Sequence, residues 1–327
     1  MTPKQSGFEM PAEWAEHEAT WIAWPHNEQD WPGRFAPIPW VYGEIVRKLA
    51  AAERVRILVQ DEAEEQFARG VLGKVGAELG RVEFHHVLTD RVWTRDFAPS
   101  FVKHRSTGEI RAVKFRFNAW AKYEDWQLDD AAGRRIPELA GKRAWTPDLV
   151  LEGGSIDVNG DGWVMTTEEC LLSAIQARNP GLSREQVESA LCEYLGVEHV
   201  LWLRNGIEGD DTHGHIDDLA RFVSHDTIVL CGGGENREIL KESPFRVIEL
   251  PMPSPVIFEG QLLPASYANF YIANGIVLVP TFNDANDRVA LNVLAEAMPD
   301  RRVIGINCVE LVWGLGTLHC MTQQQPA

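Results

Sequence analysis

The sequence predicts an α/β fold, and three features of its 327 residues support that prediction. Short apolar segments of strand length recur along the whole chain. Amphipathic segments with recognisable helix start and stop signals stand between them. No low-complexity stretch or linker divides the chain, because the proline-rich piece 251–255 is too short and too apolar to be a flexible linker. We therefore expect a single α/β domain that spans residues 1–327.

The first half of the chain predicts a strand, a helix start and a hairpin. Residues 54–60 (Arg-Val-Arg-Ile-Leu-Val-Gln) have the composition of a buried strand. The acidic run that begins at Asp61 is typical of a helix N-terminus. Residues 100–118 predict a β-hairpin, because a Ser-Thr-Gly turn ending at Gly108 separates two strand-like runs.

The second half of the chain alternates strands with helices. A helix is predicted over 183–195. Ser183 and Gln186 form a capping-box pattern at its start, and Gly196 occupies the expected stop. Another helix is predicted from about 287 to 298. Further strands are predicted over 199–204, 227–231, 246–250, 276–280 and 303–307.

Composition and charge narrow the class of protein. The chain is 45% hydrophobic and 24% charged, as in an ordinary globular protein. No apolar run approaches the roughly 20 residues that cross a bilayer. No signal region opens the sequence, so we expect a cytoplasmic protein without a membrane partner. The formal charge of −17 argues against nucleic acid as a partner and is compatible with a cationic ligand.

One of the five cysteines stands in an unusual setting. The cysteines are odd in number and scattered, without a Cys-x-x-Cys pair, so we expect reduced thiols. Structural cysteines usually lie within apolar strands or helices. Cys320 instead follows Gly314 and Gly316, whose backbone can turn tightly and approach a ligand closely. Cys320 is therefore the candidate nucleophile.

Two motifs match metal-binding patterns. Residues 157–168 fit the EF-hand calcium loop letter for letter, but strand-like segments flank them where an EF-hand needs helices. We expect a hairpin turn there instead. The spacing of His213, His215 and Asp217 resembles the His-x-His-x-Asp core of metallo-β-lactamase-type hydrolases. That pattern continues with histidine where this chain has Asp218. A metal-dependent hydrolase stays the alternative, and a metal-free site is the expectation.

Three polar clusters provide further candidate site residues besides Cys320. They are 93–96 (Trp-Thr-Arg-Asp), 152–154 (Glu-Gly-Gly) and 211–217. Each cluster alone is explained by a local ion pair or a turn. Together they supply several carboxylates and a histidine. A guanidinium group is a planar cation that carboxylates bind bidentately. Hydrolysis at its central carbon requires a strong nucleophile such as a thiolate and a histidine that moves protons.

Seven motifs in these regions resemble the agmatine deiminase family, which is grouped with the bacterial peptidylarginine deiminases. The resemblance spans nearly the whole chain. It implies a five-bladed α/β propeller, the pentein fold, built from pseudo-fivefold strand-helix repeats. It also implies hydrolysis of a guanidino group to a ureido group and ammonia, with no metal or organic cofactor. The motifs are Trp93-x-Arg95-Asp96-x-x-Pro99, Phe117-Asn118-Ala119-Trp120, Leu151-Glu152-Gly153-Gly154-Ser155, Thr166-Thr167-Glu168-Glu169-Cys170-Leu171-Leu172, Asp211-Thr212-x-Gly214-His215-Ile216-Asp217, Ser266-Tyr267-x-Asn269-Phe270-Tyr271-Ile272 and His319-Cys320-x-Thr322-Gln323-Gln324.

The resemblance also implies roles for individual residues. Cys320 matches the nucleophile that forms a covalent amidino-cysteine intermediate, and His215 matches the general acid and base. Asp96 and Asp217 match the carboxylates that bind the guanidinium, and Glu152 matches a glutamate that assists the histidine. Further substrate-binding positions implied by the family are Asp211, Trp93 and Trp120.

The expected partner is a small cationic guanidino compound. Agmatine is the expected substrate, giving N-carbamoylputrescine, an intermediate of polyamine synthesis, because Asp211 beside His215 should attract a dication. The family typically has asparagine at His213 and Gly-Gly-Gly-Asn-Ile at 314–318, where this chain has Gly-Leu-Gly-Thr-Leu. Free or peptidyl arginine, giving citrulline, is therefore an alternative substrate, and a non-catalytic binder of cations is a third reading. Family members often form homo-oligomers.

Overall fold

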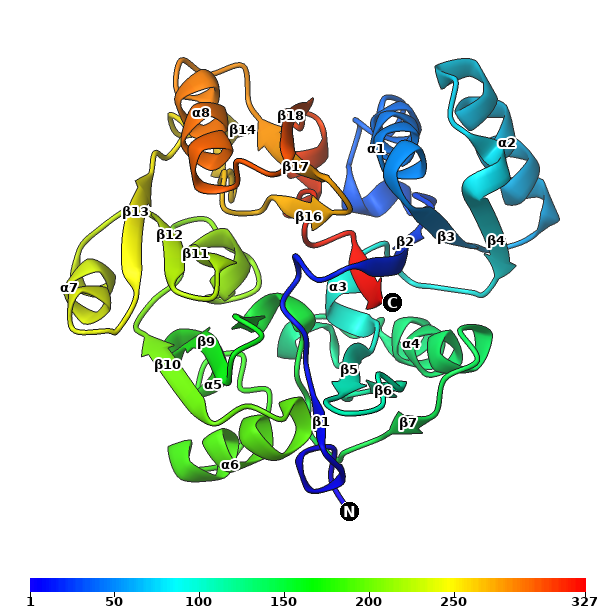
Figure 1. Cartoon of the computed structure of the whole chain (residues 1–327). Helices are drawn as coiled ribbons and strands as arrows, with labels where there is room; N and C mark the ends of the chain where they lie inside the picture. Colours follow the sequence, from blue (N-terminus) through cyan, green and yellow to red (C-terminus); the bar gives the residue numbers. More distant parts are fainter.

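The computed structural model describes all 327 residues, and its architecture is mixed α/β. Five sheets repeat one pairing pattern. Each begins with an antiparallel pair, and the second strand of that pair has a parallel neighbour on its other side. Figure 1 shows the five sheets following one another around the middle of the molecule, with the longer helices at the periphery.

The first sheet joins the two ends of the chain, in the order β19-β2-β3-β4. The last strand lies antiparallel to β2, beside the blue N-terminal segment in Figure 1. Helices α1 and α2 make the crossovers between its parallel strands. The elements are β19 (Gln323–Pro326), β2 (His17–Ala23), β3 (Arg54–Val59), β4 (Val82–His86), α1 (Ile38–Ala52) and α2 (Glu62–Val75).

The second and third sheets lie in the lower half of Figure 1. The second contains β5 (Ser100–His104), β6 (Ile110–Val113) and β7 (Ala144–Trp145), with β1 (Phe8–Glu9) added at its edge and with α3 (Thr94–Phe97) and α4 (Gln127–Leu139). The third contains β8 (Asp157–Val158), β9 (Trp163–Thr167) and β10 (His199–Leu203), with α5 (Glu168–Leu171) and α6 (Arg184–Leu195).

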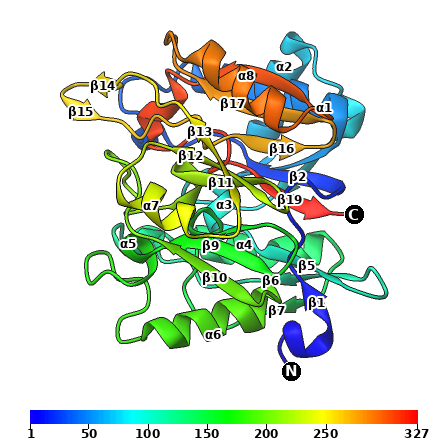
Figure 2. The same ribbon diagram turned by 60° about the vertical axis from the view of Figure 1, so that its left-hand side comes forward.

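The fourth and fifth sheets lie between the third sheet and the first sheet in Figure 1. A small hairpin of β14 and β15 projects from the edge of the molecule in Figure 2. The fourth sheet contains β11 (Ala220–Ser224), β12 (Thr227–Cys231) and β13 (Arg246–Leu250), with α7 (Glu235–Lys241). The hairpin and the fifth sheet contain β14 (Ile257–Phe258), β15 (Gln261–Leu262), β16 (Tyr271–Ala273), β17 (Ile276–Thr281) and β18 (Arg302–Asn307), with α8 (Asp287–Ala297). Short 3-10 helices are η1 (Lys4–Ser6), η2 (Glu28–Asp30), η3 (Leu79–Arg81), η4 (Ala119–Ala121), η5 (Gly153–Ser155), η6 (Ile216–Asp218) and η7 (Leu311–Gly314).

The predicted elements of the second half are confirmed at nearly the predicted bounds. Helix α6 carries the expected capping box, in which the Ser183 hydroxyl accepts from the Gln186 N–H and the Gln186 side chain accepts from the Ser183 N–H. Gly196 ends the helix with a left-handed φ of 71°. The region that matches the calcium-loop pattern forms the predicted hairpin, in which Asp157 pairs antiparallel with Met165. Strands, not helices, therefore flank that turn.

The hairpin predicted over 100–118 is confirmed but shorter. Strand β6 ends at Val113, where the chain turns to run alongside the segment after β7. Asp130 explains the change, because its carboxylate accepts from the Lys114 ammonium (2.9 Å) and from the Phe117 N–H (3.0 Å). These bonds hold residues 114–118 against α4 instead of extending the hairpin.

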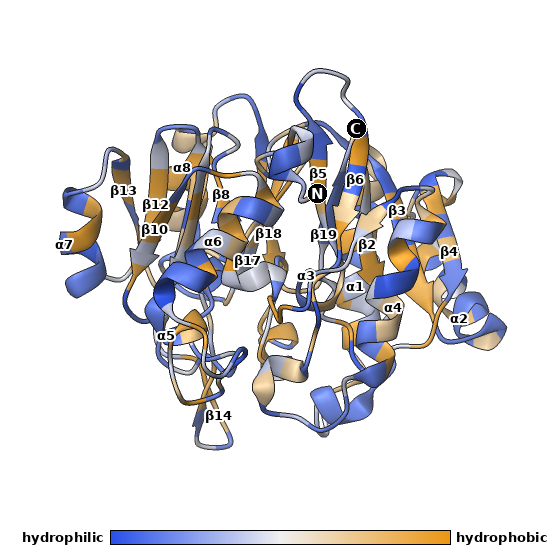
Figure 3. Cartoon of the chain, turned by 90° about the horizontal axis from the view of Figure 1, so that it is seen from below, coloured by the Kyte–Doolittle hydropathy of each residue, from blue (hydrophilic) through white to orange (hydrophobic).

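Apolar side chains fill the interiors between sheets and helices. The largest of three core clusters contains 57 residues and surrounds the strands of the first and fifth sheets. Figure 3 shows hydrophobic colour concentrated on strands, whereas much of the outer helices and loops is hydrophilic. None of the helices combines the length and the apolar character that crossing a membrane requires. The rigid sheets hold the segments that build the site.

Candidate active site

Five segments meet at the middle of the molecule, and each leads into the first strand of one of the five sheets (Figure 1). The side chains that they bring there are buried, although most are charged or nucleophilic. Cys320 and Asp96 line a cavity of about 330 Å³ beside this group. In chain order the contributing residues are Asp96, Glu152, His215 with Asp217, Asn269 and Cys320.

His215 lies among three carboxylates. Its Nδ1 is 3.9 Å from Oδ1 of Asp96 and 3.9 Å from Oδ1 of Asp217. Its Nε2 is 4.0 Å from Oε2 of Glu152, and neither ring nitrogen has a hydrogen-bond partner. Burial would lower the pKa of this imidazole, but Asp96, with help from Cys170 and Asp217, raises the pKa well above its ordinary value. The site thus favours a positive charge among these carboxylates.

The turn before η6 fixes the position of this imidazole. The Asp210 carboxylate accepts from the N–H groups of Gly214 (2.8 Å) and His215 (2.9 Å). Gly214 has a φ of 94°, which a side chain would strain, and an added Cβ would lie 2.9 Å from Cβ of Glu169. Glycine is therefore required at this position.

Asp96 is held by two donors. It accepts from Nε1 of Trp120 at 2.8 Å and from the N–H of Gly154 at 3.0 Å. Burial raises the pKa of Asp96 to about 6, against the effect of His215 and with a further contribution from Asp217. Its charged form therefore needs a cation nearby.

Asp217 belongs to a buried network that reaches the opposite end of the chain. Its Oδ2 is 2.6 Å from Nδ1 of His319, whose Nε2 is 2.8 Å from Glu13. Glu13 also accepts from Arg221 at 2.9 Å, and Arg95 lies 3.4 Å from it. Burial would raise the pKa of Asp217, but His319, together with His215 and Arg221, lowers that pKa below its ordinary value. Asp217 is therefore a fixed negative charge.

Cys320 faces this fixed charge and an amide. Its Sγ is 3.1 Å from Nδ2 of Asn269 and 3.9 Å from Oδ2 of Asp217. Burial, followed by Asp217 and Asp218, raises the pKa of the thiol well above its ordinary value. The thiol is therefore neutral until a cation enters, and the Asn269 amide is placed to stabilise the thiolate.

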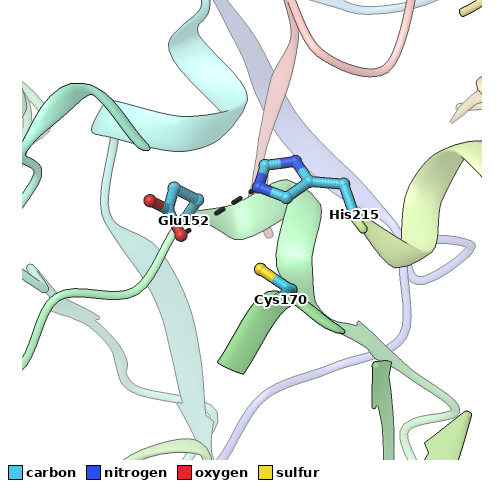
Figure 4. A group of neighbouring side chains, drawn as sticks. All are labelled: Glu152, Cys170 and His215. Carbon is cyan, nitrogen blue, oxygen red and sulfur yellow. Dashed lines mark ion pairs between the residues drawn. The ribbon is translucent and has the colours of Figure 1, made fainter. Parts of the chain in front are cut away.

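Glu152 is oriented by Arg178, whose Nε lies 3.1 Å from Oε1 of Glu152 in a fully buried ion pair. The other oxygen, Oε2, has no hydrogen-bond partner and faces His215. Figure 4 shows the thiol of Cys170 directed toward the gap between these two side chains. Sequence reasoning placed Glu152 here but missed Cys170 and Arg178.

The chain is similar to known proteins over nearly its whole length. The family model of the Porphyromonas-type peptidyl-arginine deiminases matches residues 9–326. The chain belongs to this deiminase family. It is 34% identical to an agmatine deiminase of Ectopseudomonas mendocina, over all of this chain and 97% of that protein. The agmatine deiminase structure of Enterococcus faecalis is 33% identical and superposes with a TM-score of 0.91, over 99% of this chain and 97% of that one. A Campylobacter jejuni agmatine deiminase structure is 31% identical with a TM-score of 0.86, over 97% and 96%.

The three residues predicted to bind the substrate, besides the two aspartates that bind the guanidinium, line the same cavity as Cys320. Trp93 and Trp120 form part of its wall. Asp211 also lines it, but its carboxylate is already paired with Lys122 and accepts from the Tyr123 hydroxyl at 2.7 Å. Its attraction for a second cation is therefore weaker than the sequence alone indicates.

One residue of the metal-site alternative, His213, lies apart from the other two. The His213 ring lies 3.2 Å from the Ser173 hydroxyl and 3.8 Å from Glu169. His215 instead faces Asp96, Asp217 and Glu152. His213, His215 and Asp217 therefore do not converge on one point where a single ion could contact all three.

Sequence reasoning also missed residues at the cavity wall. Asp30 and Arg91 both line the cavity, and Arg91 Nε lies 3.4 Å from Oδ1 of Asp30. Two other arginines, Arg95 and Arg204, do not line the cavity. Arg95 bonds Gln324 at 2.7 Å, and Arg204 pairs with surface glutamates.

Proposed function

We propose that this chain is a hydrolase that converts agmatine to N-carbamoylputrescine and ammonia, with Cys320 as its nucleophile. One observation carries the proposal: three carboxylates surround the unpartnered ring of His215, and this cation-binding group adjoins the cavity that contains Cys320. The agmatine deiminases of Ectopseudomonas mendocina and Enterococcus faecalis, similar over the whole chain, support the reaction and the substrate.

The geometry supports a two-step reaction. The guanidinium binds Asp96 and Asp217, and its charge favours loss of the Cys320 thiol proton to solvent, which leaves the thiolate. The thiolate attacks the central carbon, the carbon–nitrogen bond breaks, and protonated His215 gives its proton to the leaving ammonia. The product of this step is an amidino-cysteine.

Water completes the reaction. Neutral His215 takes a proton from a water molecule that attacks the amidino carbon. The carbon–sulfur bond then breaks, and the new hydroxyl gives its proton to the departing sulfur, which regenerates the Cys320 thiol. The ureido product leaves, and the proton that His215 holds is available to the next leaving group. Glu152 beside Nε2 orients the ring and stabilises its charged form in both steps.

The cavity wall favours agmatine over arginine. Arg91 is the one arginine or lysine among the residues that line the cavity. Its guanidinium already donates to the Asp125 backbone (2.7 Å) and carboxylate (2.9 Å) and stacks 4.6 Å from the Tyr123 ring centroid. Asp30 also lies beside this guanidinium, with its Oδ1 3.4 Å from Nε of Arg91. Arg91 is therefore already surrounded by partners, and no free cation in the cavity wall faces the α-carboxylate of an arginine substrate.

The substrate assay measures ureido product and ammonia from agmatine, free arginine and a peptide with C-terminal arginine. We expect kcat/KM to be highest for agmatine. A preference for either arginine substrate contradicts the substrate proposal and leaves the chemistry standing. Absence of product from all three contradicts the enzymatic proposal. Activity that is lost on chelation and restored by a metal ion supports the metal-dependent alternative.

The acid limb of the pH profile should report Asp96. Its pKa is raised to about 6 by burial, and only its ionised form binds a guanidinium. We expect kcat/KM to fall as the pH is lowered through about 6, because kcat/KM reports the free enzyme. Butylguanidine, which lacks a second charge, restricts the measurement to the guanidinium end. A profile that is flat down to pH 5 contradicts this role.

We also infer that the five repeated sheets form the five blades of a pentein propeller. The shared pairing pattern and the contribution of one site segment by each sheet support this arrangement. A single domain of residues 1–327, a cytoplasmic location and homo-oligomer formation stay predictions.

A further inference from the structure

Four carboxylates line the cavity, and three of them already have strong partners. Asp96 bonds Trp120 and Gly154 at the guanidinium end. Asp211 is engaged by Lys122 and Tyr123 on its two oxygens. Asp125 bonds Arg91 at 2.9 Å, and 53% of its side chain is exposed to solvent.

Asp30 is the exception. Its side chain is only 8% exposed, and its one charged neighbour within ion-pair distance is Nε of Arg91 at 3.4 Å, which is not placed for a hydrogen bond. Its second oxygen, Oδ2, is buried without any partner. Burial outweighs Arg91, and with Asp125 it raises the pKa of Asp30 to about 7. Such a carboxylate is stabilised by any cation that the cavity brings to it.

We propose that Asp30 binds the terminal ammonium group of the substrate and so determines specificity for a guanidino compound with a cationic tail. This inference rests on the proposed deiminase function. Gln29 and Asp30 enter the cavity wall from η2, whereas Cys320 and Asp96 lie at the reacting end. Asp30 and Asp96 line the same cavity, so one linear dication can contact both carboxylates.

The shape of the wall between the two ends supports this assignment. Trp31 follows Asp30, and its ring packs 5.8 Å from the ring of Trp93 in the cavity wall. An added Cβ at Gly314 would lie 2.6 Å from the Trp31 ring, and one at Gly316 would lie 2.7 Å from Trp93. Gly314 and Gly316 thus pack against these two rings and line the cavity with backbone alone, so neither position has a side chain that would obstruct an alkyl chain.

The test compares two substrates in Asp30→Asn, which removes the charge and keeps the shape. Agmatine and butylguanidine share the guanidino group and the four-carbon chain, and only agmatine has the ammonium. We expect the ratio of kcat/KM for agmatine to kcat/KM for butylguanidine to fall at least about tenfold. Most of this fall should come from an increase in KM for agmatine. Turnover of butylguanidine shows that the variant is folded.

Glu28→Gln is the matched control, because Glu28 lies on the same 3-10 helix, is exposed and does not line the cavity. It should leave the ratio unchanged. A ratio in Asp30→Asn within twofold of wild type overturns the inference, and so does an equal loss for both substrates. Wild-type protein that deiminates neither compound contradicts the proposed function instead, so the two failures are distinguishable.

Discussion

Cys320→Ala is expected to lower kcat by roughly four orders of magnitude or more, because Cys320 is the one cysteine that lines the cavity and supplies the thiol for the covalent intermediate. Cys320 forms no disulfide, and alanine removes only its sulfur atom, so the fold should stay intact. Steady-state ammonia release measures the loss. Cys192→Ser is the control, since Cys192 is a partly exposed cysteine on α6, outside the site.

Mass spectrometry of the protein after reaction with an amidine electrophile identifies the nucleophile directly. The adduct should be on Cys320 in the wild-type protein and absent from the alanine variant. An adduct on another cysteine, Cys170 above all, would show that the nucleophile has been assigned wrongly, because Cys170 also lies beside His215.

Gly154→Ala should lower kcat/KM by about a hundredfold or more with little loss of stability. A Cβ at this position would lie 2.6 Å from Nδ1 of His215, 2.9 Å from Oδ1 of Asp96 and 3.0 Å from Oδ2 of Asp217. The methyl group would therefore displace the groups that bind the guanidinium. The backbone itself accepts alanine, because the φ of Gly154 is not in the left-handed region.

Activity and the melting temperature should be measured together for this variant. Gly70→Ala is a suitable control, because an added Cβ on this α2 residue would meet nothing within 4 Å. Near-wild-type activity of Gly154→Ala would show that the guanidinium binds away from these three groups. A large fall in melting temperature would instead indicate a structural role for the glycine.

Local signals predicted most of the regular elements. Helix α6 was predictable because its capping residues and its terminal glycine are adjacent in sequence. Strand β19 was not, because its glutamines are polar yet buried. Gln325 accepts from Trp21 at 2.9 Å and from Arg56 at 2.7 Å, partners that lie about 270 to 300 positions away. Hydropathy cannot identify a strand whose polar groups are satisfied by such distant residues.

The candidate site was predictable where chemistry and family resemblance agreed, as for Cys320 and His215. Asn269 was missed, although it precedes the first strand of its sheet just as Asp96 and Cys320 do. That recurring position is the signal that could have found it. Glu13 carried no signal, because its role depends on contacts with His319 and Arg221 across the fold.

The pairing of β19 with β2 links catalysis to the order of folding. Gln323 lies opposite Trp21, so the first sheet needs a contact between positions about 300 residues apart. Such non-local contacts form slowly and late. Until then β2 keeps an open edge that can pair with a foreign strand. The strand that covers this edge begins three residues after Cys320, so the reactive thiol and the protection against aggregation should be acquired in the same final step.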